Sequence, residues 1–137
     1  MWWLYALLSA LFAALTAILA KVGIKGVDSD LATAFRTIVI LIIAWGIVFA
    51  KNGTTGISAL SKNNIIFLTL SGVATGLSWI FYFRALHLGE VSYVAPVDKA
   101  SVAIAIILSV LFLGETVTLK MLIGTVLVIA GTIVIIL

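Results

Sequence analysis

The sequence from Trp2 to Ala20 is WWLYALLSALFAALTAILA, an unbroken apolar run without a charged side chain. A helix that crosses a bilayer needs roughly 20 such residues. A membrane β-strand would alternate polar and apolar residues, and this run does not. A secretory signal peptide is the alternative, but it needs basic residues at its start and Met1–Tyr5 has none. The run therefore predicts a membrane-spanning α-helix.

Four more apolar segments follow at residues 31–50, 65–86, 91–113 and 119–137. Of the 137 residues, 64% are hydrophobic and 9% are charged, whereas soluble domains have about 45–50% apolar and about 25% charged residues. This composition excludes a soluble enzyme and a disordered chain, and the lack of cysteine excludes a disulfide scaffold. We expect one all-α integral membrane domain over residues 1–137, built as a five-helix transmembrane bundle.

The distribution of basic residues leaves the orientation of the bundle open. Five spans place the two termini on opposite sides of the membrane. Basic residues at the helix ends divide equally between these sides: Lys51, Lys62 and Lys120 on the side of the N-terminus, and Lys21, Lys25 and Arg84 on the other. The positive-inside rule then selects neither orientation. A short chain with few charges gives such a balance, and so does a chain that inserts both ways and pairs as an inverted homodimer.

Several short motifs resemble the EamA domains of the drug/metabolite transporter superfamily. They cover the whole chain in order: Ala20–Gly26, Leu31–Arg36, Phe81–Leu86, Leu113–Glu115, Ile123–Gly124 and Ala130–Thr132. The resemblance implies a five-helix unit that usually occurs twice in a ten-helix transporter of metabolites such as amino acids. We expect this chain to be a stand-alone half. The family commonly has a proline at the position of Val102, whereas the only proline here is Pro96, so no substrate assignment is carried onto residues 94–101.

Charged residues inside the apolar segments are the first candidates for a site, because a charge in a bilayer is costly and usually functional. Arg36, Arg84, Asp98 and Lys99 all fall in the same half of the membrane. We expect them to bind substrate in a vestibule, with Asp98 within salt-bridge reach of Arg36, Lys99 or Arg84. Arg36 is the best candidate, because Asp98 and its neighbour Lys99 point about 100° apart on a helix. The alternative is structural: Arg36 and Lys99 snorkel to the interface, and Asp98 forms a structural ion pair with one of them.

Aromatic residues form a second candidate feature. Trp79, Tyr82 and Phe83 share one helix face at positions i, i+3 and i+4, and Trp45 and Tyr93 are candidates to extend it. Such a face is suited to an organic ligand, including a cation over the rings. Packing against lipid or another helix is the alternative. We include Trp79, Tyr82 and Tyr93 among the predicted substrate-binding residues.

These features predict a secondary transporter that moves a small organic metabolite or cation as an antiparallel homodimer. The sequence has no pattern of catalytic residues or metal ligands, so we expect no enzyme activity and no cofactor. Its few basic residues are too dispersed for binding nucleic acid. The expected partners are the lipid bilayer, a second copy and the substrate, and the expected location is the plasma (inner) membrane, crossed several times. A non-transporting structural or assembly subunit of a membrane complex is the competing interpretation.

Overall fold

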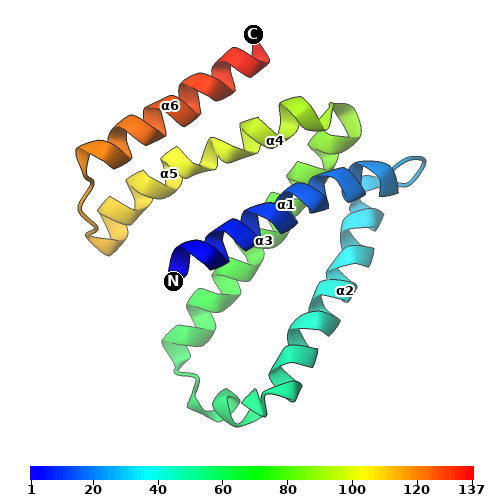
Figure 1. The fold of residues 1–137 in the computed structure, drawn as a ribbon. Coiled ribbons are helices and arrows are strands. Elements are labelled where there is room, and N and C mark those ends of the chain that lie inside the picture. Colours follow the sequence, from blue (N-terminus) through cyan, green and yellow to red (C-terminus); the bar gives the residue numbers. More distant parts are fainter. The chain divides into compact units, whose positions relative to one another are not determined.

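The computed structural model describes residues 1–137 and contains only helices and connecting segments (Figure 1). In chain order these are α1 (Trp2–Gly23), α2 (Ser29–Ala50), the 3-10 helix η1 (Gly53–Ala59), α3 (Lys62–Leu88), α4 (Val91–Lys99), α5 (Ser101–Leu108), the π-helical turn η2 (Ser109–Leu113) and α6 (Leu119–Ile136). Five stretches are long and apolar enough to cross a membrane, with α4, α5 and η2 forming one of them. The predicted five-span helical fold is confirmed.

The fourth span, Val91–Leu113, is divided into α4, α5 and η2, whereas the sequence predicted a helix over residues 91–113. Pro96 lies inside α4 and has no N–H to donate to the preceding turn. Four residues later the N–H of Ala100 donates to the carbonyl of Val97, at 3.0 Å, in a tighter turn than an α-helix has. The regular hydrogen-bond ladder therefore breaks between α4 and α5, close to the middle of the span.

The start of α2 also differs from the predicted one, by two residues. The carboxylate of Asp28 accepts hydrogen bonds from the backbone N–H groups of Asp30 and Leu31, both at 3.0 Å. A side-chain oxygen at this position satisfies N–H groups that have no partner within the helix. The helix therefore begins at Ser29, and Asp30 belongs to its first turn and not to the preceding loop.

Residues 19–87 form one of two compact units. This unit contains the end of α1, all of α2 and η1, and nearly all of α3, and its most buried apolar side chains are Ile24, Phe83 and Leu86. The ammonium group of Lys21 donates a hydrogen bond to the carbonyl of Leu86. A basic side chain at the C-terminal end of a helix satisfies a carbonyl that the helix itself leaves open. Lys21 thus connects the end of α1 to the last turn of α3.

The other unit consists of residues 1–18 and 88–137. In it, α6 runs alongside α4 and α5 (Figure 1). The buried hydroxyl of Thr132 on α6 lies 3.2 Å from the carbonyl of Pro96 on α4 and 2.9 Å from the carbonyl of Val128 in its own helix. Polar side chains that bond across helices in this way help to hold membrane bundles together.

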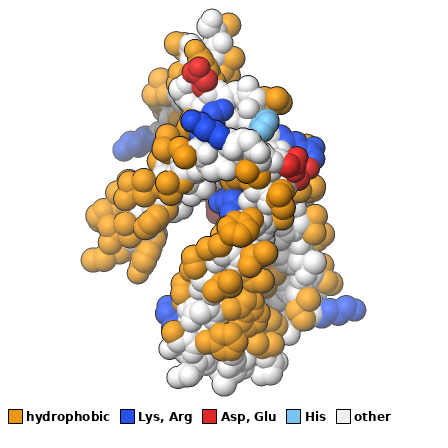
Figure 2. All heavy atoms as spheres, turned by 90° about the vertical axis from the view of Figure 1, so that its right-hand side faces the viewer, with side chains coloured by type: hydrophobic (Ala, Val, Ile, Leu, Met, Phe, Trp, Pro, Cys, Tyr) orange, Lys and Arg blue, Asp and Glu red, His pale blue; other side chains and the backbone are white.

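Hydrophobic side chains cover much of the outer surface of the helices, with few charged groups among them (Figure 2). In each of the five spans at most 6% of the most apolar stretch is buried. A protein with this much exposed apolar surface needs a non-aqueous environment. Lipid, or another protein in the membrane, must therefore cover these helices.

Candidate functional site

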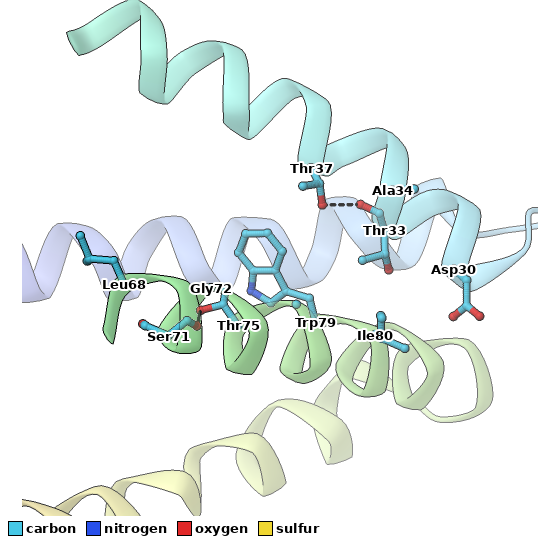
Figure 3. Close-up of a pocket in the computed structure, with 11 residues that line it drawn as sticks. Asp30, Thr33, Ala34, Thr37, Leu68, Ser71, Gly72, Thr75, Trp79 and Ile80 are labelled. Carbon is cyan, nitrogen blue, oxygen red and sulfur yellow. Dashed lines mark hydrogen bonds between the residues drawn. The ribbon is translucent and has the colours of Figure 1, made fainter. Parts of the chain in front are cut away.

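A groove of about 770 Å³ lies between α2 and α3, within the unit of residues 19–87 (Figure 3). It is lined by Asp30, Thr33, Ala34, Thr37, Leu68, Ser71, Gly72, Thr75, Gly76, Trp79 and Ile80. Several of these side chains are polar although they belong to membrane-spanning helices. Serine and threonine are common where membrane helices approach closely, whereas an ionisable residue such as Asp30 is rare in a membrane span and marks a candidate site.

Helical spacing explains why these residues meet. On α2, Asp30, Thr33 and Thr37 lie at positions i, i+3 and i+7, and on α3, Ser71, Thr75 and Trp79 follow one another at intervals of four. Both patterns keep side chains on one face of a helix. The space beside the interleaved glycines 72 and 76 is open, because a methyl group added at either would meet no atom within 4 Å. The two glycines therefore leave room in the groove beside α3.

The three threonine hydroxyl groups of the groove already donate their hydrogens to backbone carbonyls. Thr33 donates to the carbonyl of Ser29 at 2.8 Å, Thr37 to the carbonyl of Thr33 at 2.8 Å, and Thr75 to the carbonyl of Ser71 at 2.9 Å. A hydroxyl oxygen that donates its hydrogen still has lone pairs for accepting hydrogen bonds. Toward a ligand, these threonines therefore act as hydrogen-bond acceptors.

An ion pair stands at one end of the groove. The Nε and Nη2 atoms of Arg84 on α3 donate to the two carboxylate oxygens of Asp30 on α2, at 3.0 and 2.6 Å. This two-pronged geometry is the strong form of an arginine–carboxylate contact. It joins the first turn of α2 to the last turns of α3, so the predicted site residue Arg84 lies at the groove and has a structural partner.

Arg36 is held by aromatic rings and not by a carboxylate. Its guanidinium carbon lies 4.9 Å from the ring centre of Trp79 and 4.6 Å from that of Phe83. A cation is attracted to the face of an aromatic ring at such distances. Trp79 therefore takes part in two features at once, since it lines the groove and supports Arg36.

Asp98 pairs with Lys99, one of the three cations predicted to lie within its salt-bridge reach, and the expected preference for a partner on another helix is not met. The ammonium group of Lys99, its direct neighbour, lies 3.1 Å from the Asp98 carboxylate. The long, flexible lysine side chain bridges the angle of about 100° that separates adjacent positions on a helix. Both residues stand at the end of α4, beside the break at Ala100, in the unit that does not contain Arg36.

The predicted aromatic residues occupy different surroundings. The ring of Tyr82 contacts that of Phe83 edge-on, at 6.3 Å between ring centres, and Phe83 is almost fully buried. Trp45 does not extend this group within its unit but packs on Phe49, at 5.8 Å. Tyr93 is half exposed on α4, in the other unit. Trp79 is thus the predicted aromatic residue that lines the groove.

Sequence reasoning missed the hydroxyl-bearing and acidic residues of the groove. Asp30 directly precedes the predicted segment 31–50, and Thr33, Thr37, Ser71 and Thr75 carry no charge that would single them out. Their helical spacing was the available signal, because polar side chains repeat every three or four residues on two adjacent apolar segments.

Comparison with known proteins identifies the family to which the chain belongs. The whole chain, residues 1–137, matches the EamA-like transporter family. A protein of Sinorhizobium sp. that is named as an uncharacterized transporter is 48% identical over 130 residues, covering 95% of this chain and 92% of that protein. An uncharacterized protein of Methanocaldococcus jannaschii is 38% identical over 69 residues, covering 50% of each chain. No solved structure matches the chain.

Proposed function

Because the chain belongs to the EamA-like transporter family and is a membrane transporter, we propose that it carries a small organic metabolite by secondary transport. The groove between α2 and α3 is the proposed binding site. The observation that supports this most directly is a cavity of about 770 Å³ lined by Asp30, three threonines and Trp79 inside two membrane spans. Cavities of roughly 300–1,000 Å³ suit small organic ligands.

A cationic substrate is less well supported than a neutral or anionic metabolite. Cation binding by the aromatic residues would need a free ring face. The rings of Trp79 and Phe83 already contact the guanidinium of Arg36. A cation that approaches these rings would therefore be repelled by the positive charge of Arg36.

Residues of the fourth span complete the proposal. Tyr93, Asp98 and Lys99 lie on α4, whose helix breaks after Lys99. Interrupted helices in transporters often mark the part of a span that contacts substrate. These three residues stay proposed substrate-binding residues of their own unit, and Arg36, Arg84 and Tyr82 stay proposed substrate-binding residues of the α2–α3 unit.

The proposed functional unit is an antiparallel homodimer in the plasma membrane. Transporters are commonly built from two inverted halves around a central site. A five-span chain with balanced basic residues on its two sides fits one such half, and a second copy inserted in the opposite sense would supply the other.

The proposal is tested by flux in liposomes that contain the purified protein. The vesicles are loaded with a pooled small-molecule fraction, and mass spectrometry identifies the solutes that leave. We expect saturable efflux of particular metabolites, reduced at least tenfold by Trp79→Ala. Trp45→Ala is the matched control, because Trp45 contacts Phe49 and does not line the groove. Absence of flux above protein-free vesicles would contradict the proposal and favour a non-transporting subunit.

A further inference from the structure

Arg36 has a charge that no acidic residue of its unit balances. The acidic residues between 19 and 87 are Asp28 and Asp30. Asp28 caps α2 and Asp30 pairs with Arg84. Within this unit no carboxylate lies within 4.0 Å of Arg36, and its guanidinium donates no hydrogen bond to a protein acceptor. Its contacts there are the rings of Trp79 and Phe83.

The position of Arg36 makes this imbalance significant. Arg36 is seven residues beyond the start of α2, which places it roughly 10 Å along the helix at 1.5 Å per residue. The aromatic contacts hold the side chain against α3, beside the buried ring of Phe83. They stabilise the cation but use none of its five N–H donors. A guanidinium in this state is prepared to bind a carboxylate or a phosphate through two parallel hydrogen bonds.

The residues that line the neighbouring groove indicate which groups the remainder of the ligand carries. Trp79 contacts Arg36 and also lines the groove, so the guanidinium group lies beside the groove. The hydroxyl oxygens of Thr33, Thr37 and Thr75 can accept hydrogen bonds, because their hydrogens are already bound to backbone carbonyls. A ligand that fits would carry an anionic group at one end and hydroxyl donors along its body.

We infer that the transported metabolite is a hydroxylated organic anion, whose carboxylate or phosphate binds Arg36 and whose hydroxyl groups bind the threonine oxygens of the groove. This inference rests on the proposed transport function and names its substrate class. The phosphate of a lipid headgroup has the same chemistry as that of a soluble metabolite. The test must therefore distinguish these two sources.

Binding is measured by the fluorescence of Trp79 alone, in a protein with Trp2→Phe, Trp3→Phe and Trp45→Phe, held in phosphatidylcholine vesicles. The probes are gluconate and 3-phosphoglycerate as hydroxylated anions, glucose as a neutral compound and choline as a cation. We expect a saturable change with at least one anionic probe and weaker responses to glucose and choline. A response to choline or glucose but to neither anion would overturn the inference, and so would no response to any probe.

Substitutions then assign the anion to Arg36. Arg36→Gln should weaken binding of the anionic probe at least tenfold, because a charge-assisted bidentate contact is lost. Arg36→Lys should keep part of the binding, which shows that the fold is intact. Lys62→Gln removes the same charge at the far end of α3, away from the groove, and should bind normally. Equal binding by Arg36→Gln and the parent protein would contradict the inference.

Two further readouts separate the remaining explanations. If a lipid phosphate binds Arg36, native mass spectrometry will find a bound lipid in the parent protein and none in Arg36→Gln. Soluble anions will then not compete with that lipid. This result overturns the inference. Flux measurements separate it from the transport proposal. If the protein transports neutral or cationic solutes and Arg36→Gln does not change that flux, only the inference of an anionic substrate is refuted. If there is no flux at all, the transport proposal itself is refuted.

Discussion

Asp30 and Arg84 show how a charged pair is placed at the end of two membrane spans. Each side chain is about half exposed, and the contact is bidentate. In water such an exposed pair contributes little to stability, but at a membrane boundary each partner would otherwise be left as a single charge beside lipid. The pair therefore fixes the register between the first turn of α2 and the last turns of α3.

Exchanging these charges tests the pair. Asp30→Asn and Arg84→Gln should each lower the melting temperature of the detergent-solubilised protein by on the order of a few °C. The double variant with Asp30→Arg and Arg84→Asp should recover much of the loss, because opposite charges again face each other. Differential scanning fluorimetry measures the shift. A double variant less stable than both single variants would show that the residues act independently.

At this scale the sequence predicted the cations better than their partners. Arg36 and Arg84 stood out because a charge in an apolar run is conspicuous. Asp30 did not, because the cap formed by Asp28 extends α2 by two residues and moves Asp30 out of the predicted loop. The contact of Arg36 with Trp79 depends on how α2 and α3 pack, which a single sequence does not specify.

Among the elements, the fourth span has the least regular backbone. Pro96 removes one donor from α4, and the carbonyl of Pro96 accepts a hydrogen bond from Thr132 on α6. The irregular turn that follows is thus next to the point where two helices are joined by a polar contact. This contact from α6 stabilises the interrupted helix.

Removing the Thr132 hydroxyl should loosen α6 from α4. Thr132→Val keeps the shape of the side chain and should destabilise the protein by about 0.6 kcal/mol, the average for interhelical hydrogen bonds in a membrane. Thr125→Val is the control, since its hydroxyl bonds only to the carbonyl of Met121 in the same helix. Unfolding in mixed micelles measures both variants. Equal losses would show that the bond between the helices contributes nothing of its own.

Gly114 offers a second test of an element boundary. It ends the π-helical turn with a φ of 67°, a conformation that side chains disfavour, and nothing lies within 4 Å of an added methyl group. Gly114→Ala should therefore cost about 1 kcal/mol through backbone conformation alone. Gly124→Ala, in the regular helix α6 and equally unobstructed, should be neutral or stabilising. A neutral Gly114→Ala in the same unfolding assay would contradict this account.

The elements themselves were largely predictable. Long apolar runs separated by glycine and charged residues identify five spans, because a bilayer demands length and hydrophobicity from each helix. Pro96 does not by itself predict the break after Lys99, since many membrane helices contain proline without ending there. The balance between a bend and a break depends on contacts such as that of Thr132.

For the whole molecule, the proposed inverted homodimer requires that the chain insert in both orientations. A cysteine introduced at Asn52, in the connection between α2 and η1, has no native thiol as background. We expect membrane-impermeant reagents to label it from both sides of the membrane. Two lysines added to the α2–α3 connection should fix one orientation, and two added between α1 and α2 should fix the other.

Coexpression is the control for this prediction. Each fixed variant alone should lose transport, and the two expressed together should regain it, since only together do they supply both orientations. Labelling of Asn52→Cys from one side only would exclude the inverted homodimer, and the functional unit would then be a parallel dimer or a complex with a different partner chain. Full activity of one fixed variant alone would contradict the antiparallel arrangement.

The unequal lengths of α3 and α6 have a consequence for the membrane in which the protein works. At 1.5 Å per residue, the 27 residues of α3 extend about 40 Å and the 18 residues of α6 about 27 Å. A hydrocarbon layer of about 30 Å nearly matches α6 but is shorter than α3, which must tilt or keep its polar ends outside the layer. Thicker bilayers relieve this mismatch for α3 and create one for α6. Lipid acyl-chain length should therefore change the angle between α3 and the membrane normal.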